Sequence, residues 1–316
     1  MPVPSTRQTL SYLRGLFEAH GIRPKNKLGQ NFLIDLNLLD LLVRTAELTR
    51  ADLVLEIGSG TGSLSLQLAA LAGAVLCVEV DPAFAELTRR AIAGRDNVVL
   101  LHADVLKNKN ELNPELLQAL EDLHRQCGCA NLKLVANLPY VVATPVISNL
   151  LMSSLRLERM VVTVQLEIAM RLTAEPGTKE YGALSVLVQS LADVELVRRL
   201  PASAFWPRPK VESAIVQIRP NEAKRALVGD VLRFRHFLRD LYVHRRKNLR
   251  SALAGWPSGR RSREEVDRLL AQLNLSGSVR AEVLDIEQHR RLCDAFGTTT
   301  AEDRAHTSPK RQRGPA

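Results

Sequence analysis

The stretch "EIGSGTG" at residues 56–62 decides the fold class of this 316-residue chain. It ends the short apolar run at 53–58 and leads into 63–73, where leucines recur at helical spacing. Alternating glycines between a strand and a helix let the backbone turn sharply and let a ligand approach main-chain N–H groups. The three glycines are Gly58, Gly60 and Gly62. Their G-x-G-x-G spacing differs from the G-x-G-x-x-G of dinucleotide sites, which disfavours a nicotinamide cofactor and leaves a ligand-free turn as the simpler alternative.

Segments of strand type alternate with segments of helix type on both sides of this turn. Strands are expected at 53–58, 74–81, 98–104, 132–137 and 159–165, and helices at 63–73 and 83–93. Strands separated by helices of this length predict βαβ units, and hence an α/β fold with a mainly parallel sheet covered by helices on both faces. Ligands of such sheets bind beyond the carboxyl ends of the strands.

The pattern changes towards the C-terminus. Two strand-type segments, 193–201 and 213–220, are separated only by a Pro-rich loop and predict an antiparallel pair that closes the sheet. Helix formers with basic faces follow at 231–253, 262–273 and 285–296. We therefore expect an α/β domain at 1–220, a small helical domain at 221–297, and a disordered tail at 298–316 because that tail has almost no apolar residues.

The positive charge is concentrated in one segment. The chain has a formal net charge of +9 and a pI near 9.7. Between residues 223 and 263 there are twelve Lys or Arg against two acids, which accounts for the whole excess. A local excess of this kind indicates a surface for nucleic acid, whereas an evenly spread excess would be ordinary solvated charge.

Cysteine usage and hydropathy limit the other classes of protein. Four cysteines in a chain of this length do not make a disulfide framework, and the lone C-x-C at Cys127 and Cys129 lacks a second pair at zinc spacing. We expect no metal. The N-terminus lacks the apolar core of a signal peptide and no segment is apolar enough to span a membrane, so a cytoplasmic protein is expected.

Two acidic residues follow the second and third strands. Glu79 stands where carboxylates of these folds accept hydrogen bonds from both ribose hydroxyls, and Asp104 is placed to accept from an adenine amino group. Asp81 is read as the N-cap of the helix that begins with Pro82. The glycines and two acids without a phosphate-binding lysine indicate a nucleoside that lacks phosphates. S-adenosylmethionine is such a ligand.

The fourth strand leads into "NLPY" at residues 137–140 on the same rim. The Asn137 side-chain oxygen and the Leu138 carbonyl can accept the two hydrogens of an exocyclic adenine amine and leave its lone pair facing a methyl donor. Pro139 stiffens the turn, and Tyr140 offers a ring on which a base can stack. An ordinary strand-ending turn is the alternative for the tetrapeptide alone. Together with the glycine turn and the acids, it favours an amine methyltransferase.

At this point the chain resembles the small-subunit ribosomal RNA adenine N6,N6-dimethyltransferases, over nearly all of residues 21–296. The motifs occur in the family's order: "KLGQNFL" (27–33), "EIGSGTGSLS" (56–65), "VEVDP" (78–82), "NLPYVVATPVI" (137–147), "KEYGALSV" (179–186), "FWPRPKVESAIV" (205–216) and "RRKNLRSAL" (245–253). The resemblance implies a class I SAM-dependent, Rossmann-like catalytic domain with a seven-stranded sheet, and a C-terminal all-α RNA-binding domain. It also implies a monomer that dimethylates two adjacent adenines near the 3′ end of 16S rRNA within an assembling 30S subunit.

The resemblance also implies the residues of the site. Beside the cofactor it places Gln30, Asn31, Phe32, Leu33, Glu56, Gly58, Gly60, Gly62, Glu79, Val80, Asp104, Val105 and Asn137. The catalytic group is Asn137, Leu138, Pro139 and Tyr140, to which we add Phe205, because "FWPRPKV" predicts a rigid aromatic loop with Phe205 lining the target-base pocket and Trp206 as an anchor. RNA contacts are expected from Lys27, Lys210, Arg245, Arg246, Lys247 and Arg250.

Three features depart from the family pattern. Leu166 and Ala183 stand where relatives usually have a basic residue, which weakens expected RNA contacts. The segment between Asp104 and Asn137 is longer than usual and is expected to add a surface helix. Two other functions stay open: a large-subunit (23S) rRNA adenine methyltransferase of the antibiotic-resistance type, and a non-catalytic RNA-binding assembly factor with the same fold.

Overall fold

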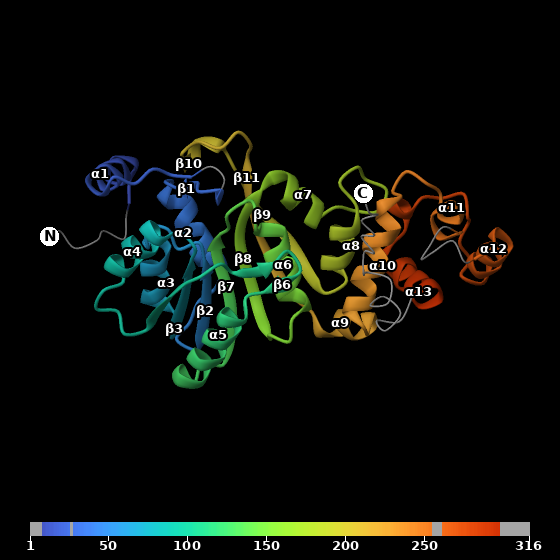
Figure 1. Ribbon diagram of the computed structural model, residues 1–316, viewed down its shortest axis with the longest axis horizontal. Helices are drawn as coiled ribbons and strands as arrows, with labels where there is room; N and C mark the ends of the chain where they lie inside the picture. Colours follow the sequence, from blue (N-terminus) through green and yellow to red (C-terminus); the bar gives the residue numbers. More distant parts are fainter. Residues whose placement is uncertain (1–7, 26–27, 255–260, 298–316) are drawn as a thin grey trace, which may run out of the picture. The chain divides into compact units, whose positions relative to one another are not determined.

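The computed structural model describes residues 8–25, 28–254 and 261–297, and the tail expected to be disordered lies outside this range. The chain divides into two compact units (Figure 1). The first comprises residues up to Thr173 together with Ala192–Pro220, and the second comprises Ala174–Leu191 and the chain from Asn221 onward. Residues 174–191, which the sequence pattern places in the α/β domain, therefore pack with the helical unit.

The first unit is built on a seven-stranded sheet in the order β4-β3-β2-β7-β8-β11-β9. The bounds are β2 Asp52–Ile57, β3 Ala74–Glu79, β4 Val98–His102, β7 Asn131–Asn137, β8 Leu157–Gln165, β9 Ala192–Leu200 and β11 Ser213–Pro220. The strands β4, β3, β2, β7 and β8, in this spatial order, run parallel to one another. The strand β11 is antiparallel to both β8 and β9. The α/β class and the closing antiparallel pair are thus confirmed.

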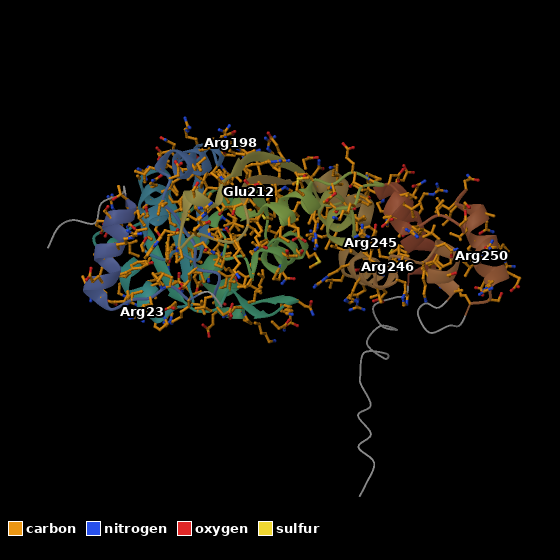
Figure 2. All side chains as sticks on the ribbon, turned by 90° about the horizontal axis from the view of Figure 1, so that it is seen from above. Arg23, Arg198, Glu212, Arg245, Arg246 and Arg250 are labelled. Atoms are coloured by element: carbon orange, nitrogen blue, oxygen red, sulfur yellow. The ribbon has the colours of Figure 1, made fainter. Side chains whose placement is uncertain are left out.

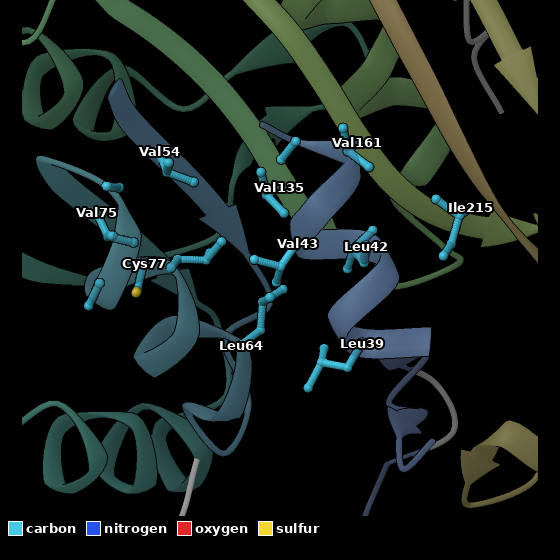
Figure 3. Close-up of a cluster of buried hydrophobic side chains, with 14 of the residues drawn as sticks. Leu39, Leu42, Val43, Val54, Leu64, Val75, Cys77, Val135, Val161 and Ile215 are labelled. Carbon is cyan, nitrogen blue, oxygen red and sulfur yellow. The ribbon is translucent and has the colours of Figure 1, made fainter. Parts of the chain in front are cut away.

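Helices cover the sheet. Their bounds are α2 Leu36–Thr45, α3 Ser63–Leu71, α4 Pro82–Ala91, α5 Pro114–Cys127, α6 Ala143–Met152 and α7 Leu166–Leu172. A core cluster joins α2 and α3 to one face through residues such as Leu42, Leu64 and Val54 (Figure 3). Leu53 and Leu55, which point the other way along β2, are also buried. Side chains on both sides of the strand are thus buried, as is expected for a strand of a sheet that helices cover on both faces.

The segment between Asp104 and Asn137 contains the helix α5, as expected. Asn113 caps its N-terminus by accepting from the Glu115 amide, and Pro114 occupies the first turn. Its buried residues Leu116 and Leu120 recur at a spacing of four, and the helix packs on β2 and β3. The helix therefore belongs to the layer that covers the sheet.

Short elements complete the first unit. The helix α1 (Leu10–His20) precedes β1 (Phe32–Leu33), which pairs with β10 (Phe205–Trp206), and β5 (Leu106–Asn108) pairs with β6 (Glu111–Leu112). The β1–β10 pairing joins "QNFL" to "FWPRP", two motifs that are far apart in the sequence. Both the N-terminal segment and the loop after β9 are thereby held at defined places.

The second unit is helical: α8 Ala183–Gln189, α9 Glu222–Val228, α10 Val231–Val243, α11 Leu249–Ala254, α12 Arg263–Gln272 and α13 Ile286–Phe296. The segment of helix formers at 231–253 forms two helices, because α10 ends at Val243 and α11 begins at Leu249. The Asn248 side chain accepts from the Ser251 amide, so it caps a new helix. Among the described residues, no helix combines the length and the apolar character that a membrane crossing requires.

Candidate active site

A cavity opens at the carboxyl ends of the parallel strands β2, β3 and β7. It is lined by Leu28, Gly29, Gln30, Asn31, Phe32, Ile57, Gly58, Gly60, Val78, Glu79, Val80, Ala103, Asp104, Val105, Asn137, Pro139, Val141 and Val142. Most of the expected cofactor residues are therefore brought together, as the rule for ligand sites in such sheets predicts. Val141 and Val142 were missed, although they directly follow the predicted tetrapeptide.

A second, smaller cavity lies against the same glycine turn. It is lined by Gln8, Leu13, Phe32, Leu33, Leu39, Glu56, Gly58, Ser59, Gly60, Thr61, Ser63, Leu64 and Asn137. It shares Phe32, Gly58, Gly60 and Asn137 with the first cavity. Leu33 and Glu56, which the sequence assigns to the cofactor, line only this second cavity.

The glycine turn needs glycine for both backbone and steric reasons. Gly58 has φ +78°, and a Cβ built there would lie 3.1 Å from Cγ and Cδ of Pro139. Gly60 has φ +58°, and its Cβ would lie 3.0 Å from the Phe32 ring. Positive φ values disfavour residues with a side chain. The turn is thus pressed against the tetrapeptide and against β1.

Gly62 differs from the other two glycines. It lines neither of the two cavities. A Cβ there would lie 2.6 Å from the Cβ of Ala91, so glycine lets α3 approach α4. The structure therefore gives Gly62 a packing role where the resemblance implies a cofactor contact.

The Glu79 carboxylate organises the main cavity. One oxygen accepts from the Gly60 amide at 2.9 Å, and the other accepts from the Val80 and Asp81 amides at 3.0 and 2.9 Å. Burial raises its pKa, and these backbone hydrogen bonds act in the opposite direction. Three of the roughly four lone-pair positions of a carboxylate are used in this way. Glu79 thus holds the glycine turn in place as well as facing the cavity.

Asp81 anchors the segment that carries Gln30. One oxygen accepts from the Ala83 amide, as the expected N-cap of α4, and the other accepts from Lys25 Nζ at 2.7 Å and Gln30 Nε2 at 3.2 Å. Burial by itself would raise the pKa of Asp81, but the hydrogen bonds from Lys25, Gln30 and Ala83 outweigh it and hold that pKa below its ordinary value. Gln30 is thereby fixed at the rim of the cavity.

Glu56 is buried behind the glycine turn. Its Oε2 accepts from Ser65 Oγ at 2.5 Å and from Cys77 Sγ at 3.2 Å. Burial raises its pKa to about 7. Asp104, in contrast, is exposed at the end of β4, and its Oδ1 accepts from the Leu106 amide at 2.9 Å. Glu56 is therefore a buried carboxyl group behind the turn, whereas Asp104 is a solvent-exposed carboxyl group at the main cavity.

Asn137 is oriented from both sides. Its Nδ2 donates to the Asn31 carbonyl at 2.8 Å, and its Oδ1 accepts from the Thr163 hydroxyl. Thr163 lies opposite Asn137 in the register of β7 and β8 and is fully buried. The amide orientation is thus set by a carbonyl, which only accepts, and by a hydroxyl. Thr163 was missed because its role depends on strand pairing.

The other residues of the tetrapeptide are held by packing and by one hydroxyl pair. Leu138 is buried, Pro139 packs against Gly58, and Tyr140 Oη lies 2.6 Å from Ser213 Oγ on β11. Burial raises the pKa of Tyr140, and the hydrogen bond with Ser213 acts in the opposite direction. The hydroxyl contact holds the Tyr140 side chain, which is partly buried and lines neither of the two cavities.

Phe205 is not a wall of the cavity. It is 2% exposed, belongs to the same core cluster as Leu39 and Val43, and lines neither of the two cavities. Its pairing with Leu33 turns the ring into the core. Trp206 lies 5.2 Å from the Phe17 ring centroid and anchors the loop on α1, as expected. The pocket-lining role expected of Phe205 is therefore replaced by a packing role.

The basic residues expected in the helical unit fall into two groups, those that pair with acids and those that are exposed in a turn; Figure 2 labels Arg245 and Arg250 of the first group and Arg246 of the second. Arg245 bonds to Glu282 at 2.9 Å and donates to the Lys179 carbonyl, and Arg250 bonds to Asp267. Arg246 and Lys247 are exposed in the turn between α10 and α11. Lys210 is exposed before β11, and Lys27 lies outside the described residues. Acids from outside the basic segment thus neutralise part of its charge, which the sequence count alone does not reveal.

The fold and this site define a class of protein. A seven-stranded sheet with one antiparallel strand near the edge, and a glycine turn beside a strand-end acid, are the features of class I methyltransferases. The chain belongs to the ribosomal RNA adenine dimethylase family, whose model matches residues 21–290. The chain is thus an enzyme of the methyltransferase type.

Curated relatives support the assignment over nearly the whole chain. A ribosomal RNA small subunit methyltransferase A from Pelotomaculum thermopropionicum is 38% identical over 90% of this chain and 95% of its own length. The protein of the same name from Geobacillus kaustophilus is 36% identical over 89% of this chain and 94% of its own length.

Solved structures show the same fold. A dimethyladenosine transferase from Plasmodium falciparum superposes with a TM-score of 0.65, at 24% identity, over 81% of this chain and 94% of its own. The 23S rRNA methyltransferase ErmE superposes with a TM-score of 0.58, at 25% identity, over 84% of this chain and 99% of its own. These likenesses support the fold, and the choice of substrate depends on other arguments.

Proposed function

We propose that this enzyme transfers methyl groups from S-adenosylmethionine to N6 of two adjacent adenines near the 3′ end of small-subunit (16S) rRNA, giving N6,N6-dimethyladenine. The single observation that carries the proposal is that Asn137 and Pro139 of the tetrapeptide line the same cavity as Glu79 and Asp104. A nucleoside site and an amine-binding site therefore meet at one rim. The names of the relatives described above supply the class of RNA.

The residues of the donor side fit the proposed cofactor. Glu79 and Asp104 lie at the ends of neighbouring strands and suit a ribose and an adenine, and Gly58 and Gly60 line the same cavity. The sulfonium of the donor makes its methyl group electrophilic. Glu79 already accepts three hydrogen bonds from backbone amides, which leaves about one lone-pair position of its carboxylate. We therefore propose that it holds the glycine turn and also accepts from one ribose hydroxyl.

On the acceptor side, the residues orient an amine. Asn137 Oδ1 accepts from Thr163 and keeps a second lone pair, which we assign to a hydrogen of the target amine. The Leu138 carbonyl is proposed to accept the other hydrogen. Tyr140, fixed through Ser213, offers its ring for stacking of the base. These contacts would direct the nitrogen lone pair towards the methyl group and lower the cost of alignment.

The RNA is proposed to contact the turn between α10 and α11 through Arg246 and Lys247, with Lys210 as a further contact. We assign Arg245 and Arg250 a supporting role, because their guanidinium groups already bind acids of the helical unit. The same proposal has the enzyme acting as a monomer in the cytoplasm on rRNA within an assembling 30S subunit. A 23S substrate is not favoured by the relatives described.

The test is methyl transfer to small-subunit assembly particles and to large-subunit particles, both isolated without the modification, with mass spectrometry of the digested RNA. Dimethyladenine confined to the small-subunit RNA is expected. Asn137→Ala should lower the rate by about 100-fold or more, because an acceptor aimed at the developing charge is removed, while affinity for S-adenosylhomocysteine persists. Monomethyladenine as the final product, or modification of the large-subunit RNA alone, would contradict the proposal.

A matched pair of variants tests how Asn137 is held. Thr163→Val removes the hydroxyl that Asn137 Oδ1 accepts from and nearly preserves the volume, so the rate should fall by about 10- to 100-fold through misorientation of the amide. Thr163→Ser keeps the hydroxyl and should retain most of the rate. Equal rates for the two variants would show that the Asn137–Thr163 hydrogen bond does not position the amide.

A further inference from the structure

The second cavity contains a buried polar atom that the methyl-transfer proposal does not use. Gln8 lines this cavity and is 3% exposed. Its Oε1 has no hydrogen-bond partner within the described part of the chain. A buried amide oxygen without a partner costs free energy, so an acceptor in this state is a candidate ligand contact.

The orientation of the Gln8 amide is determined by the glycine turn. Its Nε2 donates to the Thr61 carbonyl at 3.2 Å. Since a carbonyl can only accept, the nitrogen must face Thr61, and the oxygen is left as the free end of the amide. Thr61 lies between Gly60 and Gly62, so the Gln8 side chain spans from the start of α1 to the turn that borders both cavities.

The position of Gln8 is supported by the packing of α1. Thr9 caps the helix by accepting from the Tyr12 amide. Phe17 on the same helix lies 5.3 Å from the Phe32 ring centroid and 5.5 Å from that of Phe84, both edge-on. This aromatic cluster holds α1 beside the cavity wall. Gln8 is therefore a defined part of the site.

The two cavities are neighbours, because both are lined by Phe32, Gly58, Gly60 and Asn137. The first carries Glu79 and Asp104, which we assign to the ribose and the base. The second shares Gly58, Gly60 and Asn137 with it and adds Gln8. A ligand whose nucleoside lies in the first cavity can therefore place its other end in the second cavity. In S-adenosylmethionine that end carries an α-ammonium group, which donates hydrogen bonds and accepts none.

We propose that Gln8 Oε1 accepts a hydrogen bond from the α-ammonium group of the cofactor, so that the start of α1 recognises the amino-acid end of the methyl donor. This inference rests on the proposed function, because it requires that cofactor. Gln8 then has two tasks, which its two amide atoms separate: Nε2 ties α1 to the glycine turn, and Oε1 binds the ligand.

The test compares two ligands that share the nucleoside but differ at the other end. Isothermal titration measures S-adenosylhomocysteine, which carries the amino-acid end, and 5′-methylthioadenosine, which lacks it. In Gln8→Met, which keeps the length and the apolar stem, affinity for S-adenosylhomocysteine should fall by about tenfold or more, as for a hydrogen bond to a charged group. Affinity for 5′-methylthioadenosine should stay within about twofold.

A second variant separates the two tasks of Gln8. Gln8→Glu keeps an acceptor but removes the donor to Thr61, so it should bind S-adenosylhomocysteine more tightly than Gln8→Met does. Equal weakening of both ligands in Gln8→Met, or equal affinities of Gln8→Glu and Gln8→Met for S-adenosylhomocysteine, would assign Gln8 to the support of α1 alone and overturn the inference. If the unmodified enzyme binds neither ligand, the proposed function itself fails.

Discussion

At the scale of single residues, the buried acid Glu56 shows how surroundings change chemistry. It is 1% exposed, and the donors to its Oε2 are a hydroxyl and a thiol rather than a cation. Burial raises its pKa from 4.5 to about 7, and the charge of Glu79 acts in the same direction. An acid in this state destabilises the fold whenever it is ionised, because the unfolded chain hydrates the carboxylate better.

The raised pKa of Glu56 makes stability depend on pH. Between pH 4.5 and 7 the folded protein binds more protons at Glu56 than the unfolded chain does, so the free energy of unfolding falls as pH rises and stays reduced above pH 7. In Glu56→Gln, the fall of the free energy of unfolding between pH 4.5 and 7 should be smaller by about 1–3 kcal/mol. Urea denaturation of the ligand-free protein from pH 5 to 8 checks this, with the exposed Glu121→Gln as control. A variant with an unaltered pH profile would refute it.

At the scale of elements, two loops that are far apart in the sequence are interlocked. The glycine turn after β2 and the tetrapeptide after β7 meet where Gly58 contacts the Pro139 ring. Gly29 approaches the same loop from the segment before β1, since its Cβ would lie 3.1 Å from the Tyr140 amide nitrogen. The loops on the donor and acceptor sides of the site are therefore packed directly against each other, which restricts the movement of both.

The corresponding prediction compares two glycine variants. Gly58→Ala places a side chain at φ +78° and 3.1 Å from Pro139, so unfolding free energy should fall by about 1–3 kcal/mol and affinity for S-adenosylhomocysteine by about tenfold or more. Gly15→Ala lies inside α1 with open space around its Cβ, and should raise stability by about 0.5–1 kcal/mol. Calorimetry and thermal unfolding measure both. Wild-type affinity in Gly58→Ala would contradict the assigned role of the turn.

At the scale of the whole molecule, charge is distributed in a way that the sequence count hides. The segment 223–263 carries the excess of Lys and Arg, but Glu282 and Asp267 from beyond it bind Arg245 and Arg250. Arg233 donates to the carbonyls of Cys293 and Gly297 at the end of α13. Part of the basic segment therefore stabilises the helical unit. Only the residues exposed to solvent remain available to phosphates.

Salt dependence of RNA binding separates the two groups. For the double variant Arg246→Ala/Lys247→Ala, the log–log slope of affinity for a small-subunit RNA fragment against salt should become shallower by about 0.7–0.9 for each phosphate that is no longer neutralised. Lys107→Ala serves as a control, because Lys107 lies in the first unit and pairs with Glu111. An unchanged slope in the double variant would place the RNA-binding surface elsewhere.

Local patterns were sufficient for most of the fold. Hydrophobic runs, helix caps such as Asp81 and the spacing of glycines are set by neighbours in the chain, so the strands, their α/β order and the closing antiparallel pair could be predicted. The place of the main cavity could also be predicted, because residues at the carboxyl ends of neighbouring parallel strands lie close together. The break between α10 and α11 could not be predicted in this way. The Asn248 side chain accepts from the Ser251 amide there, and periodicity alone does not distinguish such a cap from an interior residue of a helix.

The sequence by itself determined which chemistry this protein carries, since the glycine turn, Glu79 and "NLPY" each depend on residue type and local order. Only the tertiary structure decided what each side chain does. Pairing with Leu33 buries Phe205, register with β8 brings Thr163 to Asn137, and packing of α1 leaves Gln8 Oε1 without a partner among the described residues. These outcomes depend on contacts between segments far apart in the chain, and burial, hydrogen-bond partners and pKa follow from such contacts rather than from the local sequence.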